Sequence, residues 1–284
     1  MKARAGIISF LLSALLLPSV TDYAQQSRCI PVRSVREADL AFCGGERLSY
    51  VLKYRFGFIN SDIGDAVVSL DTVNMGSEGA FHCRVYGKTR GFYDRLFHVE
   101  EDFNSYFTRE GLTPLRFTRN THEGRYRATN EYAYNWTEES PWLDAKVYTS
   151  RWGETRSFNI PLKTCTFDLP SLFFYARNMD LSRVEQDVKY PMTFAIDEEI
   201  FDVYFIYRGR ETLKVKNIGN VKCLSFAAKL LEGGVFKGDS DMIIYVSDDE
   251  NRIPVYFYAK ILVGEVSGRL TGAEGLKNEF AALS

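Results

Sequence analysis

Histidine and cysteine, the residue types that most often build metal centres and nucleophilic sites, are scarce in this sequence. The 284 residues include three histidines and five cysteines, and no two cysteines have C-x-x-C spacing. The histidines, His82, His98 and His122, fall on separate predicted strands without the spacing of metal ligands. We therefore expect no metal site and no cofactor, with the histidines facing solvent or lying at strand edges. A three-histidine metal site is the alternative if adjacent strands bring these residues together.

An excess of charge of one sign is also missing. Lysine and arginine number 35, aspartate and glutamate 37, and the formal net charge is −2. Such a balance creates no strong field that would steer a polyanion toward the protein. The composition therefore argues against a nucleic acid as the partner.

Long apolar runs are missing after residue 24. No apolar run in that part of the sequence approaches the roughly 18 residues that a membrane-spanning helix needs. Residues 1–24 combine a basic start, Lys2 and Arg4, with an apolar stretch at 6–20 and with Ala24 at the predicted cleavage point. This segment is typical of a secretory signal peptide. We expect an exported protein with no transmembrane segment after signal cleavage, in the periplasm or, as the alternative, outside the cell.

A nucleophile elbow of the form G-x-S-x-G is absent as well. Acidic segments at 197–199, 238–241 and 248–250 supply carboxylates, and the last offers oxygen ligands for calcium as an alternative. No pattern places two of them across a cleft, as acid–base catalysis requires. The sequence favours solvated turns here and predicts no catalytic residue.

What the sequence does contain is apolar alternation with a period of two, at 47–56, 65–71, 81–88 and 126–136. The pattern is typical of strands with one buried and one solvent-facing side, which antiparallel sheets allow. Turn-forming residues separate these segments at 60–62, 74–77, 109–111 and 122–124. The first half is therefore predicted to be an up-and-down meander. Less regular apolar segments predict further strands at 201–207, 221–231, 242–246 and 255–263.

One helix is expected between the two halves. Asp168 can cap it, Pro170 suits its first turn, and Leu169, Leu172, Phe173 and Ala176 follow helical spacing. Two segments, 106–117 and 245–257, also resemble each other, since in each a strand and a polar turn precede a strand that starts at proline. Two ordinary hairpins explain this likeness, with an internal duplication as the alternative.

The order of several motifs resembles a family of exported bacterial proteins, domain of unknown function 3108. The motifs are 45–50 with 63–66, 106–118 with Pro114, Asp168-x-x-Ser171-x-x-x-Tyr175-x-Arg177, and 247–255. The resemblance covers Gly45 to Leu270 and implies no catalytic residue, because the family has no assigned function. The proline hairpins and curved meander are also similar to the periplasmic lipoprotein-carrier superfamily, in which a half-open barrel holds acyl chains.

These observations predict an all-β fold with minor α content, a strongly curved antiparallel sheet or half-open β-barrel with one covering helix. The expected organisation is a signal peptide at 1–24, an irregular N-terminal segment at 25–44 and a single β-rich domain at 45–284.

Aromatic residues are abundant, with 17 Tyr, 21 Phe and 3 Trp, and many lie on the predicted inner face. They either fill the core or line a cavity for an acyl chain or a similar apolar body. For the second case the predicted ligand contacts are Tyr54, Tyr132, Tyr134, Phe173 and Phe174. Phe173 and Phe174 act as a lid in this hypothesis, or belong to a permanent plug.

A basic hairpin at 116–127 carries Arg116, Arg119, Arg125 and Arg127. Arginine forks suit phosphate and carboxylate groups, so these four residues are predicted contacts for anionic head groups of the envelope. An ordinary solvated face is the alternative.

Five cysteines in an oxidising compartment cannot all pair within one chain. We expect a disulfide between Cys29 and Cys43, the two that lie in the N-terminal segment. The function predicted from these features is a non-enzymatic periplasmic protein that binds or carries an apolar ligand such as a lipid. An envelope scaffold with a solid core is the alternative, and a hydrolase-type enzyme with an unrecognised site is third.

Overall fold

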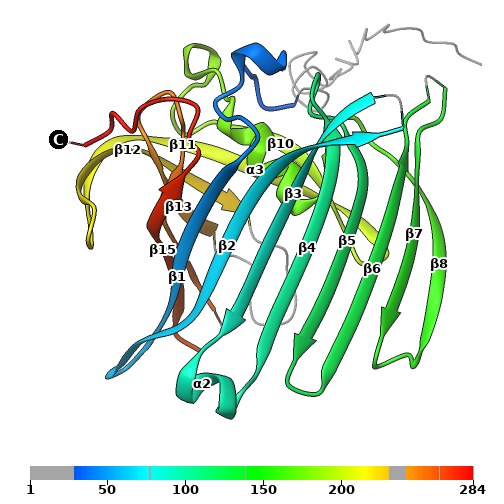
Figure 1. Cartoon of the computed structure of the whole chain (residues 1–284), viewed down its shortest axis with the longest axis horizontal. Helices are drawn as coiled ribbons and strands as arrows, with labels where there is room; N and C mark the ends of the chain where they lie inside the picture. The colour runs from blue at the N-terminus through cyan, green and yellow to red at the C-terminus, as the bar shows by residue number, and fades with distance from the viewer. Residues whose placement is uncertain (1–28, 77, 138, 230–240, 262, 284) are drawn as a thin grey trace, which may run out of the picture.

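Fifteen strands form one continuous sheet in the computed structural model of the chain (Figure 1). The structure describes residues 29–283 except 77, 138, 230–240 and 262, so the predicted signal peptide lies outside the described residues. The strands of the first half are β1 (Glu46–Phe56), β2 (Ile59–Met75), β3 (Glu78–Thr89), β4 (Val99–Thr108), β5 (Pro114–Glu123), β6 (Tyr126–Asn135), β7 (Trp142–Thr149) and β8 (Glu154–Pro161). Those of the second half are β9 (Thr166–Phe167), β10 (Lys189–Ile196), β11 (Glu199–Val215), β12 (Gly219–Lys229), β13 (Asp241–Ser247), β14 (Pro254–Lys260) and β15 (Glu265–Glu274).

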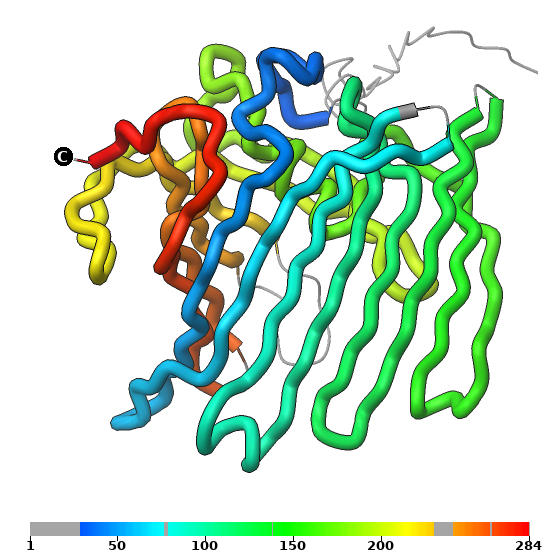
Figure 2. Tube along the Cα trace, in the orientation of Figure 1, coloured from blue at the N-terminus to red at the C-terminus, as the bar shows by residue number. Residues whose placement is uncertain are grey.

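The sheet is an antiparallel meander that is not closed. Strands β8 to β1 follow one another in reverse chain order, β1 then pairs with β15, and β15 to β9 complete the order. Only the two-residue strand β9 is parallel to its neighbour, β10, among the described strands. The tube view shows the strands of the first half side by side and the second half curling behind them (Figure 2). The predicted fold class, a strongly curved half-open β-barrel, is confirmed.

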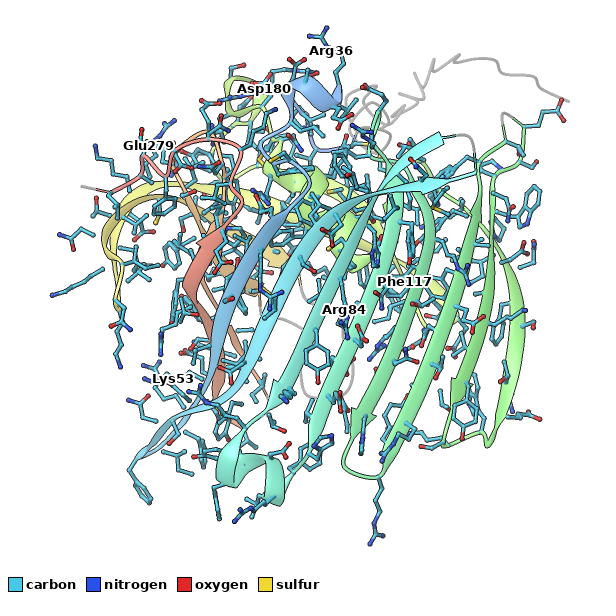
Figure 3. All side chains as sticks on the ribbon, in the orientation of Figure 1. Arg36, Lys53, Arg84, Phe117, Asp180 and Glu279 are labelled. Carbon is cyan, nitrogen blue, oxygen red and sulfur yellow. A yellow bond between two sulfur atoms is a disulfide. The ribbon has the colours of Figure 1, made fainter. Side chains whose placement is uncertain are left out.

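Alternation places the side chains of each strand on two faces, one concave and one convex. On β3 and β5, for example, Arg84 is exposed on the convex face whereas Phe117 is buried on the concave face (Figure 3). Cross-strand partners share a face, so the registers extend this assignment from strand to strand. The predicted period of two therefore identifies the buried face correctly.

The first turn differs from the prediction. Residues 60–62 belong to β2, and the β1–β2 connection is a two-residue turn at Gly57 and Phe58, with Phe56 opposite Ile59. Gly57 adopts a φ of 55°, a left-handed conformation that glycine takes at low cost. A short helix that was not predicted, α2 (Gly91–Leu96), connects β3 to β4.

Helix α3 (Leu169–Arg177) confirms the predicted helix and its cap. The Asp168 carboxylate accepts the Ser171 backbone N–H at 3.0 Å, and the Ser171 hydroxyl lies 3.1 Å from the Asp168 N–H, which completes a capping box. The helix packs on β3, β4 and β10, against the concave side of the sheet. Phe174 is fully buried there, with ring centroids 4.6 Å from Phe42 and 5.9 Å from Phe107.

The N-terminal segment at 29–45 is part of the core. Ile30, Leu40 and Phe42 are at most 2% exposed. The segment includes the 3-10 turn η1 (Glu37–Asp39), and a second such turn, η2 (Leu181–Arg183), follows α3. Backbone hydrogen bonds tie Arg33 to Asn178 and Asp180 to Pro31. The segment therefore lies along the end of α3 rather than apart from the sheet.

The predicted Cys29–Cys43 disulfide is wrong. Cys29 is bonded to Cys165, with the two Cα atoms 5.5 Å apart. The pairing follows from the position of the N-terminal segment, because the same hydrogen bonds that hold 31–33 against α3 bring Cys29 to the residue before β9. Cys43 is free and directs its Sγ toward the Gly275 carbonyl oxygen at 3.6 Å.

Candidate functional site

Three of the five predicted ligand contacts are packed core residues. Phe174 and Tyr132 are 0% and 2% exposed, and Tyr134 is buried beside them. The Tyr132 hydroxyl donates to the Asp197 backbone carbonyl at 2.7 Å, which ties the β10–β11 turn to the concave face of β6. An apolar ligand has no access to these rings without displacing this core. Phe173 and Tyr54 are half-buried, and the Tyr54 hydroxyl donates to the Val263 carbonyl at 2.9 Å.

Beneath α3 lies a fully buried carboxyl group. Burial raises the pKa of Asp168 to about 6, against hydrogen bonds from Ser171 that lower it. The hydroxyls of Ser105 and Tyr134 lie beside the same carboxyl. A pKa near neutrality suits acid–base chemistry, but this group is 0% exposed and caps a helix. Because Asp168 is buried and caps α3, we assign it a structural role.

A buried ion pair fixes the other end of α3. The Arg177 guanidinium forms a bidentate pair with the Glu46 carboxylate, and its Nη2 also donates to the Asn251 carbonyl at 2.8 Å. Both side chains are at most 2% exposed. The guanidinium also lies 5.3 Å from the ring centroids of Phe42 and Phe174. Each buried charge therefore has a partner of opposite sign, and the guanidinium also has the Asn251 carbonyl and two aromatic rings.

The four predicted arginine contacts do not form one patch. Arg116 and Arg127 are exposed on the convex face near opposite ends of the β5–β6 hairpin, about 20 Å apart at the rise of a strand. Arg125 is exposed in the β5–β6 turn, beside Arg127 and at the other end of the hairpin from Arg116. Arg119 points the other way, to the concave face.

Arg119 belongs to a polar cluster on that concave face. Its Nη1 lies 3.4 Å from Asp197 and its Nε 3.5 Å from Glu101, and its guanidinium carbon is 5.6 Å from the Phe103 ring centroid. Burial raises the pKa of Glu101, although Arg119 and the Thr121 hydroxyl, 2.8 Å away, favour its charged form. The arginine is already paired with protein carboxylates, so a lipid head group would compete with them.

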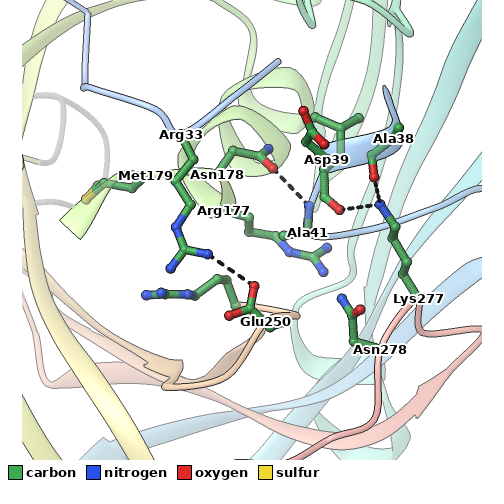
Figure 4. Close-up of a pocket in the computed structure, with 12 residues that line it drawn as sticks. Arg33, Ala38, Asp39, Ala41, Arg177, Asn178, Met179, Glu250, Lys277 and Asn278 are labelled. Atoms are coloured by element: carbon green, nitrogen blue, oxygen red, sulfur yellow. Dashed lines mark hydrogen bonds and ion pairs between the residues drawn. The ribbon is translucent and has the colours of Figure 1, made fainter. Parts of the chain in front are cut away.

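Two cavities lie at the end of the sheet that the N-terminal segment and α3 cover. The first, of about 200 Å³, has polar walls (Figure 4). Arg33 pairs with Glu250 at 3.1 Å inside it, and the Lys277 ammonium donates to the Ala38 carbonyl at 2.7 Å. The second, of about 450 Å³, is an open depression beside Phe42 and Cys43 with charged neighbours. Neither resembles the enclosed apolar site that a lipid chain requires.

The opposite end of the sheet exposes large apolar side chains. We call this set the apolar rim: Phe56, Phe58, Ile59, Phe92, Leu96, Phe97 and Val263. Phe58 is fully exposed, and Phe92 and Leu96 are each 69% exposed. Exposure on this scale costs free energy in water, and contiguous apolar surfaces usually mark an interaction site.

The rim residues sit on neighbouring connections at the lower end of the sheet (Figure 1). They come from the β1–β2 turn, from α2 with the residue that follows it, and from the β14–β15 turn. Arg55 opposite Glu265 places the β14–β15 turn beside the end of β1. The Arg90 N–H donates to the Ile63 carbonyl, which places the start of α2 beside β2. The register therefore brings these three segments to the same edge.

Above the rim, the concave face continues with half-buried apolar residues. They follow in register from the buried core positions, and they are Leu52, Val85, Val99, Phe103, Phe257 and Val266. We call this set the lower concave face. By alternation and register it leads from buried core residues such as Tyr50 to Phe56 and Ile59 of the apolar rim, which lie on the same face.

Sequence reasoning missed the apolar rim. The signal was present, because Phe56-Gly57-Phe58-Ile59 places three large apolar residues around a glycine that suits a tight turn. The polar residues at 60–62 fit a turn more closely by composition, so the sequence predicts the turn there and not at Gly57.

The two histidines His98 and His122 lie together, whereas His82 stacks on Tyr106 elsewhere on the convex face. None of the described helices is long and apolar enough to cross a membrane.

Comparison with known proteins adds a family and a fold. The model of the family described as "Protein of unknown function (DUF3108)" matches residues 49–271. None of the curated proteins matches the chain. Among solved structures, the chain is similar to a β-barrel-like protein of the domain of unknown function DUF1849 from Brucella abortus. The identity is 10% and the TM-score 0.55, over 82% of this chain and 98% of that chain.

Proposed function

The chain belongs to the DUF3108 family, proteins of unknown function, and we propose that it is a non-enzymatic periplasmic protein that binds or carries an apolar ligand such as a lipid. The binding surface in this proposal is the lower concave face together with the apolar rim. The buried aromatics Tyr132, Tyr134 and Phe174 serve as the core that supports it.

The observation that carries the proposal is the apolar rim itself. Seven large apolar side chains that could have been polar are exposed at one end of a curved sheet. Fully burying a side chain such as Phe or Leu contributes about 1.5–3 kcal/mol, so this end gains substantially when an apolar body covers it. The half-buried residues of the lower concave face extend the apolar surface inward from that edge, as a ligand with an acyl chain requires.

The proposed periplasmic location rests on two features. The N-terminal sequence is typical of a signal peptide. The Cys29–Cys165 disulfide fits an oxidising compartment, because disulfides are rare in a reducing cytosol.

A second candidate function is an envelope scaffold whose apolar rim binds a protein. The close packing at the end of the sheet covered by α3 and the N-terminal segment favours the scaffold, because these two elements occupy the space in which a cavity was predicted. The two candidate functions differ in what covers the apolar rim, a lipid or a protein. Binding to lipid vesicles therefore distinguishes between them.

The test replaces two rim residues, Phe58→Ser and Phe92→Ser together, in the mature protein and measures co-flotation with phosphatidylcholine vesicles. Both side chains are exposed, so each substitution is expected to change the free energy of unfolding by less than about 0.5 kcal/mol. We expect the wild type to float with the vesicles and the double variant to float at least five-fold less.

Leu169→Ser is the matched control, because Leu169 is also an exposed apolar residue, 45% exposed, but lies at the start of α3, away from the rim. It should float like the wild type. A wild type that stays with the soluble fraction, or a rim variant that floats equally well, contradicts binding of an apolar body at the rim.

A further inference from the structure

Three side chains with metal-ligating atoms meet on the convex face, beside α2. Glu100 on β4 is the cross-strand partner of His122 on β5, and His98 precedes β4 by one residue. The two imidazole ring centroids are 4.3 Å apart. One potential ligand atom from each of the three residues lies within 4.8 Å of the other two.

The spacing of the ligand atoms suits a shared ion. His98 Nε2 and Glu100 Oε2 are 3.4 Å apart. Two ligand atoms that each lie about 2.1 Å from a tetrahedral metal are themselves about 3.4 Å apart. A small shift of the side chains toward the centre of the cluster would bring His122 to the same distance.

Each of the three residues also has a partner for the polar atom that the ion would not use. The Asp94 carboxylate lies 2.7 Å from His98 Nδ1, and the Tyr86 hydroxyl donates to Glu100 Oε1 at 2.7 Å. His122 Nε2 lies 3.2 Å from the Gly124 carbonyl, to which it can donate, leaving Nδ1 for the ion.

Such partners orient metal ligands, because a hydrogen bond to one ring nitrogen fixes the tautomer and leaves the lone pair of the other. Asp94 is held in turn by the Thr89 hydroxyl, at 2.8 Å.

We propose that His98, Glu100 and His122 bind a divalent transition-metal ion of the zinc type. Two imidazoles and one carboxylate suit zinc, whereas magnesium and calcium prefer oxygen ligands. Three protein ligands leave one position for water or an external group. The ion would also link the segment after α2 to β5 and so hold the helix that carries Phe92 and Leu96. This proposal departs from the expectation that the scarce histidines form no metal site.

The test is a titration of the mature, chelator-treated protein with zinc chloride, in which isothermal titration calorimetry measures the affinity and the stoichiometry. We expect one zinc ion per chain for the wild type and at least a hundred-fold weaker binding for His98→Ala and for His122→Ala. Asp94→Asn, which removes the partner of the His98 ring, should weaken binding by about 10–100-fold.

The chain supplies its own controls. His82→Ala removes the third histidine, and Cys43→Ser removes the partly exposed thiol, and both should bind zinc like the wild type. Side-chain NMR of the wild type needs no variant, so misfolding of a variant cannot affect it. Zinc should shift the imidazole signals of His98 and His122 and leave those of His82 unchanged. Absence of saturable binding, equal binding by His122→Ala, loss of binding in either control or a shift of the His82 signals overturns the proposal.

Discussion

Asp168 combines two opposing effects in one carboxyl group. Its oxygen caps α3 through the Ser171 N–H, yet complete burial raises its pKa to about 6 from an ordinary value near 3.8. The native state therefore holds a proton between these two pH values that the unfolded chain has released. The free energy of unfolding consequently falls as the pH rises through this window.

The pH dependence of Asp168→Asn tests this account. Asparagine also caps helices but does not titrate. We expect the unfolding free energy of the wild type, relative to that of the variant, to fall by roughly 2–3 kcal/mol between pH 4 and pH 7. Urea denaturation at these two pH values measures the difference, and a difference that does not change with pH would show that the carboxyl group keeps its ordinary pKa.

Single residues were the least predictable part of the molecule. The capping role of Asp168 follows from local sequence, because a cap acts on the next turn of the chain. The Glu46–Arg177 pair spans 131 positions, and no local pattern indicates it. The direction of Arg119 follows from alternation in β5, but its partner Glu101 comes from strand β4 and its partner Asp197 from the β10–β11 turn.

At the scale of elements, the N-terminal segment behaves as a structural strap. Residues 29–45 bury Ile30, Leu40 and Phe42 against α3 and the sheet, and the Cys29–Cys165 disulfide joins the start of this strap to the residue before β9. The strap and α3 together fill the upper concave side, which is why the predicted lid residue Phe174 is buried there.

Removing the disulfide should loosen the strap. The double variant Cys29→Ser/Cys165→Ser loses a link between residues 136 positions apart, and we expect the free energy of unfolding to fall by about 2–4 kcal/mol. Cys43→Ser is the control, since its thiol is free, and should lose less than about 1 kcal/mol. Equal stability of the two variants in urea denaturation would contradict a structural role for the disulfide.

The two proline hairpins show how much a local pattern can predict. In β4–β5, Tyr106 pairs with Arg116 and Phe107 with Pro114, and in β13–β14, Tyr245 pairs with Tyr256 and Val246 with Pro254. Leu112 and Arg252, each two residues before the proline, have φ values of 54° and 53°. The sequence likeness therefore extends to the same bulge and the same turn. The first turn was placed wrongly because polar residues at 60–62 outweighed the glycine at position 57.

At the scale of the whole molecule, the curved open sheet was predictable because alternation is repeated in many strands, and each repeat supports the others. What the sheet encloses was not. Whether an aromatic residue fills a core or faces a ligand depends on which segments cover it, and the N-terminal segment and α3 do so from distant parts of the chain. The apolar rim likewise arises where three connections meet at one edge.

Solvent extraction of the purified protein tests directly whether this end of the sheet binds an apolar body. Mature protein purified from a periplasm without detergent is extracted with organic solvent, and the extract is analysed by mass spectrometry. We expect a stoichiometric lipid or other apolar molecule in the extract of the wild type and much less of it in that of the Phe58→Ser/Phe92→Ser variant. An empty extract, including after incubation with envelope lipids, would contradict the carrier function and leave the apolar rim as a surface for a protein partner.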